Sequence, residues 1–91
     1  MGVMAQIISA KLQEAFQPSL IRLDDDSARH AGHAGAAPGG ESHFNLVIEA
    51  AAFAGMSRVA RQRAVYAVLK DELAGQLHAL SVKALAPGEQ A

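Results

Sequence analysis

The 91-residue chain contains no cysteine. This absence excludes a disulfide framework, a thiol nucleophile and a zinc site built from thiolates. Tryptophan is also absent, and aromatic residues make up only 4% of a chain that is 51% hydrophobic. The core must therefore be built mainly from aliphatic side chains and alanine, and an aromatic platform for stacking nucleic acid bases is missing.

The chain also lacks an excess of positive or negative charge and lacks long apolar runs. The formal net charge is −1, which gives no global positive field to hold nucleic acid, so any basic patch must be local. No stretch reaches the roughly 20 apolar residues that cross a bilayer, and the N-terminus has no basic leader. Gln6 stands where a myristoylation pattern needs Ser or Thr. We expect a soluble, cytoplasmic protein that does not bind membranes.

The length suffices for one domain, residues 1–91, with a single modest core. Hydrophobic periodicity predicts a helix over 4–16, a strand in SLIRLDDD (19–26), a strand over 42–50, a helical turn over 50–55, a helix over 58–75 and a strand over 77–85. Residues 24–42 are predicted to be a flexible loop because they are rich in glycine and alanine, and residues 86–91 are predicted to be disordered. The order of elements indicates an α+β fold with helices packed on one face of a three-stranded sheet.

Two helical stripes and the alternation in the strands predict the core. In the first helix Met4, Ile8, Leu12 and Phe16 recur every fourth residue. This stripe is expected to pack on a sheet face that bears Phe44, Leu46, Ile48, Leu80 and Val82. The stripe of the long helix consists of Val59, Tyr66, Leu69 and Leu73, with Val65 and Val68 beside it, and Ser57 is its expected N-cap.

Catalytic signals are weak. Ser42, His43 and an aspartate could be assembled on paper into a triad, but no nucleophile elbow, P-loop or dinucleotide fingerprint accompanies them. Three acids at 24–26 are most simply a solvated charge run. We therefore expect a protein that is not an enzyme.

Three arginines, Arg58, Arg61 and Arg63, crowd the first turns of the long helix, where the positive end of the helix dipole disfavours cations. Together with Lys70 they could form a surface that faces phosphates. Alternatively, the side chains extend over the core and pair with the acids at 24–26.

The histidines are stronger candidates for a functional site than the arginines, because they could bind a metal. His30 and His33 lie in the glycine-rich loop, and His78 begins the last predicted strand, whereas His43 belongs to a strand and is expected to be structural. Three imidazoles are too few for a closed structural zinc site, which needs four ligands. They could instead supply part of a site whose other ligands belong to a partner, or they could be ordinary solvated residues.

Four segments in order, DDSARHAGHAG (25–35), GESHF (40–44), FAGMSRVARQRAVYAVLKDEL (53–73) and LHALSVKALAP (77–87), resemble the BolA-like proteins over nearly the whole chain. The resemblance implies a fold of helix, strand, strand, two helices and strand that is related to the class II KH module. The segment FAGMSR replaces the phosphate-clamping GXXG loop of nucleic-acid-binding KH domains, which weakens any transfer of RNA binding.

The resemblance also implies a function. BolA-like proteins partner monothiol glutaredoxins and share a [2Fe–2S] cluster with them in iron–sulfur trafficking or iron regulation. The family's HAL histidine corresponds to His78, and its loop ligand corresponds to His30, with His33 a second candidate. A chain without cysteine can join such a cluster only through imidazole, while the partner and glutathione supply the sulfur. Alone, the chain is expected to carry no cofactor and to be a monomer or a weak homodimer.

Bacterial members of the family are also described as DNA-binding regulators of morphology and stress response, which is the alternative function here. That role would use Arg58, Arg61, Arg63 and Lys70, with weak binding to DNA. Two departures from the family pattern stand out. Gln62, which falls on the apolar stripe of the helix, replaces the histidine that is common between the two arginines. The C-terminus APGEQA (86–91) lacks the longer tail that many members carry.

Overall fold

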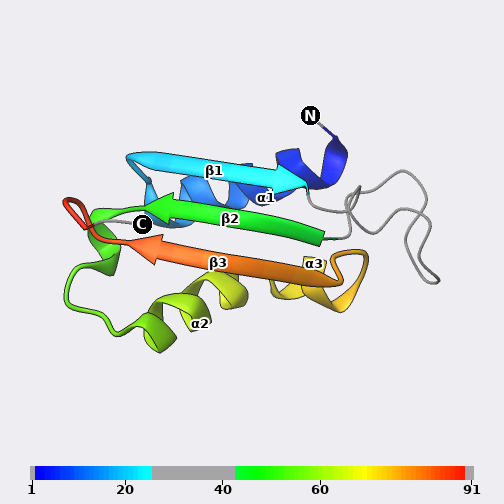
Figure 1. Ribbon diagram of the computed structural model, residues 1–91. Coiled ribbons are helices and arrows are strands. Elements are labelled where there is room, and N and C mark those ends of the chain that lie inside the picture. The colour runs from blue at the N-terminus through cyan, green and yellow to red at the C-terminus, as the bar shows by residue number, and fades with distance from the viewer. Residues whose placement is uncertain (1, 26–42, 90–91) are drawn as a thin grey trace.

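The computed structural model describes residues 2–25 and 43–89. The elements are α1 (Val3–Phe16), β1 (Leu20–Asp25), β2 (His43–Glu49), the 3-10 turn η2 (Ala51–Phe53), α2 (Arg58–Val68), α3 (Lys70–Ala74) and β3 (Ala79–Leu85). Figure 1 shows the three strands side by side with the helices behind them. The predicted α+β class and the order of its elements are confirmed.

Helix α1 follows its predicted stripe, since Met4, Ile8 and Leu12 are all buried. The helix ends at Gln17, which has a left-handed backbone (φ 49°) and donates its backbone N–H to the carbonyl of Gln13. Pro18 follows and cannot continue the helix.

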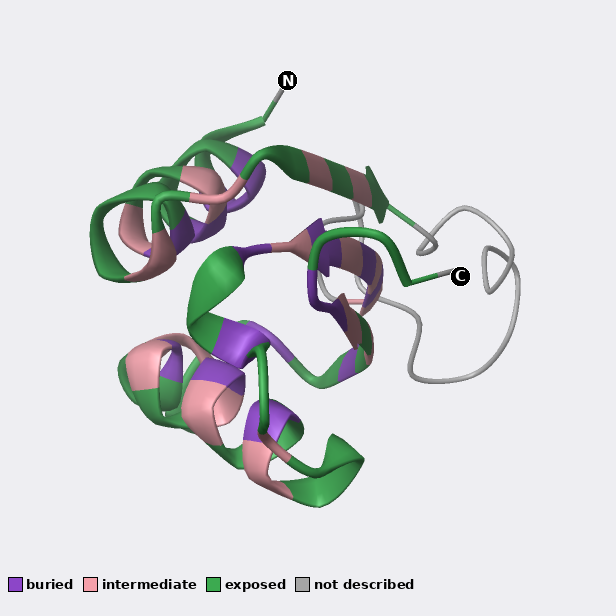
Figure 2. Ribbon diagram, turned by 90° about the vertical axis from the view of Figure 1, so that its left-hand side faces the viewer, coloured by how far each residue is buried: buried purple, intermediate pink, exposed green. Residues whose placement is uncertain are grey.

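The sheet is mixed. Its strand order is β1-β2-β3, with β1 antiparallel and β3 parallel to the central strand β2. Buried residues alternate along β2 at Phe44, Leu46 and Ile48, so one face of the strand meets the core. Figure 2, which views the molecule end-on, shows the helices on one side of the sheet, as predicted.

The core fills the space between the helices and this face. Its fully buried large side chains are Phe53, Ile8, Leu12, Leu46, Ile48, Leu69, Leu77 and Val65. Phe44 and Leu80 join this cluster, and Val82 packs against it while partly exposed, so the predicted stripe of α1 and the predicted sheet face share one core. The rings of Phe16 and Phe53 lie 4.9 Å apart and extend the core to the end of α1.

Three expectations need correction. The helix predicted over 58–75 is divided at Leu69 into α2 and α3, and Val59, placed on its apolar stripe, is 56% exposed. Asp24 and Asp25 belong to β1, which agrees with the strand predicted over 19–26 and contradicts the loop predicted over 24–42, because they pair with Asn45 and Phe44. The remainder of the predicted loop, 26–42, lies outside the described residues.

The C-terminal residues 86–89 form a turn, whereas the sequence predicts disorder for them. Gly88 has φ 89°, a left-handed backbone that glycine adopts without strain. The carboxylate of Glu89 accepts the backbone N–H of Ala86 and also pairs with Arg61. These contacts order the turn against the sheet; residues 90–91 lie outside the described part of the chain.

Candidate functional site

Two histidines meet at one end of the sheet. Because β2 and β3 are parallel, their first residues lie side by side, and His43 is in register with Ala79. His78 directly precedes Ala79, so β3 begins two residues later than the strand predicted over 77–85, and His78 lies just before it. The ring centroids of His43 and His78 lie 6.1 Å apart in an edge-on arrangement.

The same end of the sheet holds both ends of the segment 26–42. Strand β1 ends at Asp25, which is paired with Phe44, and β2 begins at His43 (Figure 1). The predicted loop ligands His30 and His33 lie outside the described residues, but this segment connects them to the strand ends beside His43. Asp25 and His43, the described residues that flank this segment in the sequence, therefore both lie at the end of the sheet where the histidine pair is found.

The two imidazoles differ in exposure. His78 is exposed and His43 is half-buried. The sequence alone does not predict this pair, because it indicates a structural role for His43 and a ligand role for His78. The signal that could have joined them is the position of each at the start of a strand, but only the parallel register of β2 and β3 brings those starts together.

The side chains at this end of the sheet can supply only some of the ligands that a metal site needs. Within residues 2–25 and 43–89 no group of three or more His, Asp or Glu side chains converges as metal ligands. Two neighbouring imidazoles can supply nitrogen ligands to a metal, and the thiolate ligands that iron–sulfur clusters need are absent because the chain has no cysteine. A cluster bound here would require sulfur ligands from another molecule.

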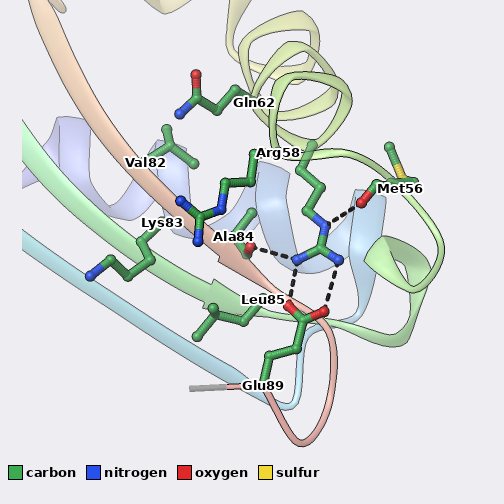
Figure 3. Close-up of a pocket in the computed structure, with 9 residues that line it drawn as sticks. Met56, Arg58, Gln62, Val82, Lys83, Ala84, Leu85 and Glu89 are labelled. Atoms are coloured by element: carbon green, nitrogen blue, oxygen red, sulfur yellow. Dashed lines mark hydrogen bonds and ion pairs between the residues drawn. The ribbon is translucent and has the colours of Figure 1, made fainter. Parts of the chain in front are cut away.

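A second feature is a groove between α2 and β3 at the opposite end of β3 (Figure 3). Its volume is about 610 Å³, and it is lined by Met56, Arg58, Arg61, Gln62, Val82, Lys83, Ala84, Leu85 and Glu89. Ser57 caps the N-terminus of α2 as predicted, because its hydroxyl accepts the backbone N–H of Ala60 at 3.1 Å. The capped first turn places Arg58 at the groove.

Arg61 lies in the wall of this groove and is only 7% exposed. Its Nε donates to the carbonyl of Met56 at 3.1 Å and its Nη1 donates to the carbonyl of Ala84 at 3.0 Å. Its two terminal nitrogens bind the two carboxylate oxygens of Glu89 at 2.5 and 3.0 Å. Such bidentate pairs between arginine and carboxylate are the strong type of charged hydrogen bond.

The pairing shifts both pKa values. The hydrogen bonds from Arg61, followed by the backbone N–H of Ala86, lower the pKa of Glu89 to about 2, and the carboxylate raises the pKa of Arg61. Through these hydrogen bonds Arg61 links α2, β3 and the C-terminal turn. The sequence expectation that Arg61 faces phosphate is therefore corrected, because its guanidinium is buried against partners within the chain.

The other three cations of the predicted phosphate-facing surface do lie at the surface of the protein. Arg58, Arg63 and Lys70 are exposed. Gln62, which stands where the family commonly has histidine, is also exposed and lines the groove beside Val82 (Figure 3). Gln62 therefore does not lie on the buried face of the helix, where the sequence pattern places it.

Comparison with known proteins gives the family. Residues 12–89 match the BolA-like protein family, which accounts for most of the chain. The chain belongs to the BolA-like family. A BolA-like protein 1 from Bos taurus is 36% identical over 88 residues, covering 97% of this chain and 62% of the relative. A Sinorhizobium protein described as "Uncharacterized protein in cobS 5'region" is 48% identical over 87 residues, with 94% of each chain covered.

Solved BolA structures share the fold. The BolA domain of SufE1 from Arabidopsis thaliana superposes with a TM-score of 0.87 at 42% identity, and 99% of each chain is covered. BolA1 from the same plant gives a TM-score of 0.85 at 35% identity over the full length of both chains. The predicted family and fold class are thereby confirmed, while the relation to class II KH modules stays a prediction.

The relatives vary in length and location. This BolA-like chain matches 25% of the Arabidopsis "SufE-like protein 1, chloroplastic/mitochondrial", so in that protein the BolA part is one domain of a longer chain. The plant names include organelles, and the expectation of a cytoplasmic protein stays a prediction. Among the described residues no helix is both long enough and apolar enough to cross a membrane.

Proposed function

We propose that this BolA-like protein is a non-enzymatic adaptor that holds a [2Fe–2S] cluster jointly with a monothiol glutaredoxin and glutathione. The observation that carries the proposal is the exposed imidazole of His78, which directly precedes β3 and lies beside His43, the residue that follows the segment bearing His30 and His33. The chain's membership of the BolA-like family supports it, because the resemblance to that family implies a role in iron–sulfur trafficking or iron regulation.

His78 is the principal ligand in this proposal. It is exposed, so a partner's cluster can reach its ring, and the backbone that follows it is fixed by pairing with β2. His30 or His33 supplies the second nitrogen, while the glutaredoxin and glutathione supply the thiolates. Replacement of thiolate by imidazole raises the reduction potential of a [2Fe–2S] cluster, so the shared cluster would be easier to reduce than an all-thiolate one.

The test is the visible circular dichroism of the heterocomplex reconstituted with a cluster-loaded monothiol glutaredoxin. We expect His78→Ala to abolish the ligation by this chain, while the glutaredoxin still docks. His30→Ala should weaken the cluster or change its spectrum, His33 should partly compensate, and the double variant should be worse than either single one.

Gln76→Ala is the matched control, because Gln76 is exposed in the same connection two residues before His78. It should leave both the spectrum and the lifetime of the cluster unchanged. If His78→Ala also left them unchanged, the ligand assignment would be wrong and the cluster function would lose its structural basis.

The alternative function, DNA binding, rests on Arg58, Arg63 and Lys70, the exposed members of the basic group. The internal pairing of Arg61 reduces the number of cations that can reach a phosphate backbone. We therefore rank DNA binding below the cluster function.

A further inference from the structure

We propose that His43 and His78 together form a binding site for a single divalent transition-metal ion of the Zn²⁺, Ni²⁺ or Cu²⁺ class on the isolated chain. This site needs neither a glutaredoxin nor a cluster, and it gives His43 a role that the cluster proposal does not. Imidazole nitrogen is a ligand that suits all three ions.

The separation of the rings fits one shared ion. A metal bound to an imidazole nitrogen at about 2.0–2.1 Å lies about 3.2 Å from the centre of that ring. Two imidazoles on one ion then have ring centres about 5 to 6.4 Å apart, for angles at the metal between about 105° and 180°. The observed 6.1 Å lies inside this interval. The tetrahedral angle that zinc prefers corresponds to ring centres about 5.2 Å apart. The ring of the exposed His78 would have to move by less than about 1 Å toward His43 to reach that separation.

The backbone holds the two residues in place. His43 belongs to the central strand and is in register with Ala79, the neighbour of His78, so the parallel ladder fixes the backbone of His43 and the backbone directly after His78. Side chains held by strands keep their positions more accurately than side chains on loops, which applies here to His43. Because the backbone is already fixed, the ion has to order only the two side chains when it binds. This lowers the entropy cost of binding and favours a measurable affinity.

The remaining coordination positions are open. Because His78 is exposed, water or a further ligand can complete the sphere, as in metal sites that keep an open position. Occupancy by such an ion and ligation of a cluster by His78 exclude each other. Divalent metal would therefore compete with cluster sharing through this one residue.

The experiment is calorimetric titration of the full, metal-stripped chain with zinc chloride, repeated with nickel and copper salts. We expect one ion per chain, with copper bound more tightly than nickel or zinc as the Irving–Williams order requires. His43→Ala and His78→Ala should each raise the Kd at least about tenfold, since even changes outside the ligand set cost about 10- to 100-fold. The double variant His30→Ala/His33→Ala should retain the parent Kd.

His43 is half-buried in the central strand, so His43→Gln is a second variant that keeps side-chain bulk, and far-UV circular dichroism checks that each variant is folded. Absence of saturable binding by the parent would overturn the proposal. It would equally fail if a folded His43→Gln chain kept the parent Kd, or if the double loop variant lost binding.

The two proposals fail independently of each other. Zinc binding that depends on His43, with no change in the visible circular dichroism of a loaded glutaredoxin when this chain is added, would refute only the cluster function. A change in that spectrum that depends on His78, caused by a chain that does not bind zinc, would refute only the two-histidine site.

Discussion

Leu46 offers the most direct test of the core. It lies at the centre of β2, the middle strand, and is 1% exposed. Replacement by alanine removes three carbon atoms, which contribute about 2.4 kcal/mol at about 0.8 kcal/mol each. The cavity left behind adds to this loss, because the surrounding side chains relax only partly, so the total should be about 3–5 kcal/mol.

Urea unfolding followed by far-UV circular dichroism measures this change. A chain of this length is expected to have about 5–14 kcal/mol of stability in total, so Leu46→Ala should remain folded in water or lie near the limit of stability. The midpoint should fall while the slope of the free energy of unfolding against urea stays the same, as for a change in stability alone.

Leu20→Ala is the matched control, because the same atoms are removed from a side chain that is 43% exposed on the edge strand β1. We expect it to cost less than about 1 kcal/mol. If Leu46→Ala were within 1 kcal/mol of Leu20→Ala, the assignment of the β2 face to a tightly packed core would be refuted.

The remaining predictions concern the groove and its surroundings. The pKa of Glu89 is depressed from its ordinary 4.5 to about 2, so its pairing contributes stability above pH 4.5 that is lost as the pH falls through about 2; Glu89→Gln should lack this part of an acid unfolding curve. Tyr66→Phe should cost about 0.5–1.5 kcal/mol in urea unfolding, because the Tyr66 hydroxyl donates to the carbonyl of Leu80 at 2.9 Å; an unchanged midpoint would contradict this. DNA binding should be weak, with a slope of log affinity against log salt of about −2 to −3 from two or three exposed cations, and Arg58→Ala should reduce that slope by about 1 in a fluorescence anisotropy titration. Tight binding to one sequence at physiological salt would reverse our ranking of the two functions.

The elements that sequence reasoning predicted well are those in which a local period reports burial directly. The alternation of Phe44, Leu46 and Ile48 and the fourfold spacing of Ile8 and Leu12 each describe one face of one element. Such patterns need no knowledge of where the partner lies. The hydroxyl of Ser57 was predictable for the same reason, because a cap acts within one turn.

Arg61 shows where local reasoning fails. A charged residue in the first turn of a helix is expected at the surface, yet Arg61 is buried, while Val59 two residues earlier is exposed. The burial is tolerated because Glu89 and two backbone carbonyls satisfy the guanidinium. Glu89 comes from a turn predicted to be disordered, and no pattern within α2 indicates that a carboxylate will arrive there.

The histidine pair and the groove occupy opposite ends of β3, which makes their functions separable. His78 precedes the first residue of the strand, whereas Ala84 and Leu85 at its other end line the groove. Six steps of about 3.3 Å separate Ala79 from Leu85, or about 20 Å. Substitutions more than about 7–10 Å apart with no shared partner act additively. Arg58→Ala should therefore leave the spectrum of the shared cluster unchanged, and His78→Ala should leave the salt dependence of DNA binding unchanged. If either substitution altered both measurements, one partner would have to span the whole length of β3, and the two surfaces would belong to a single site.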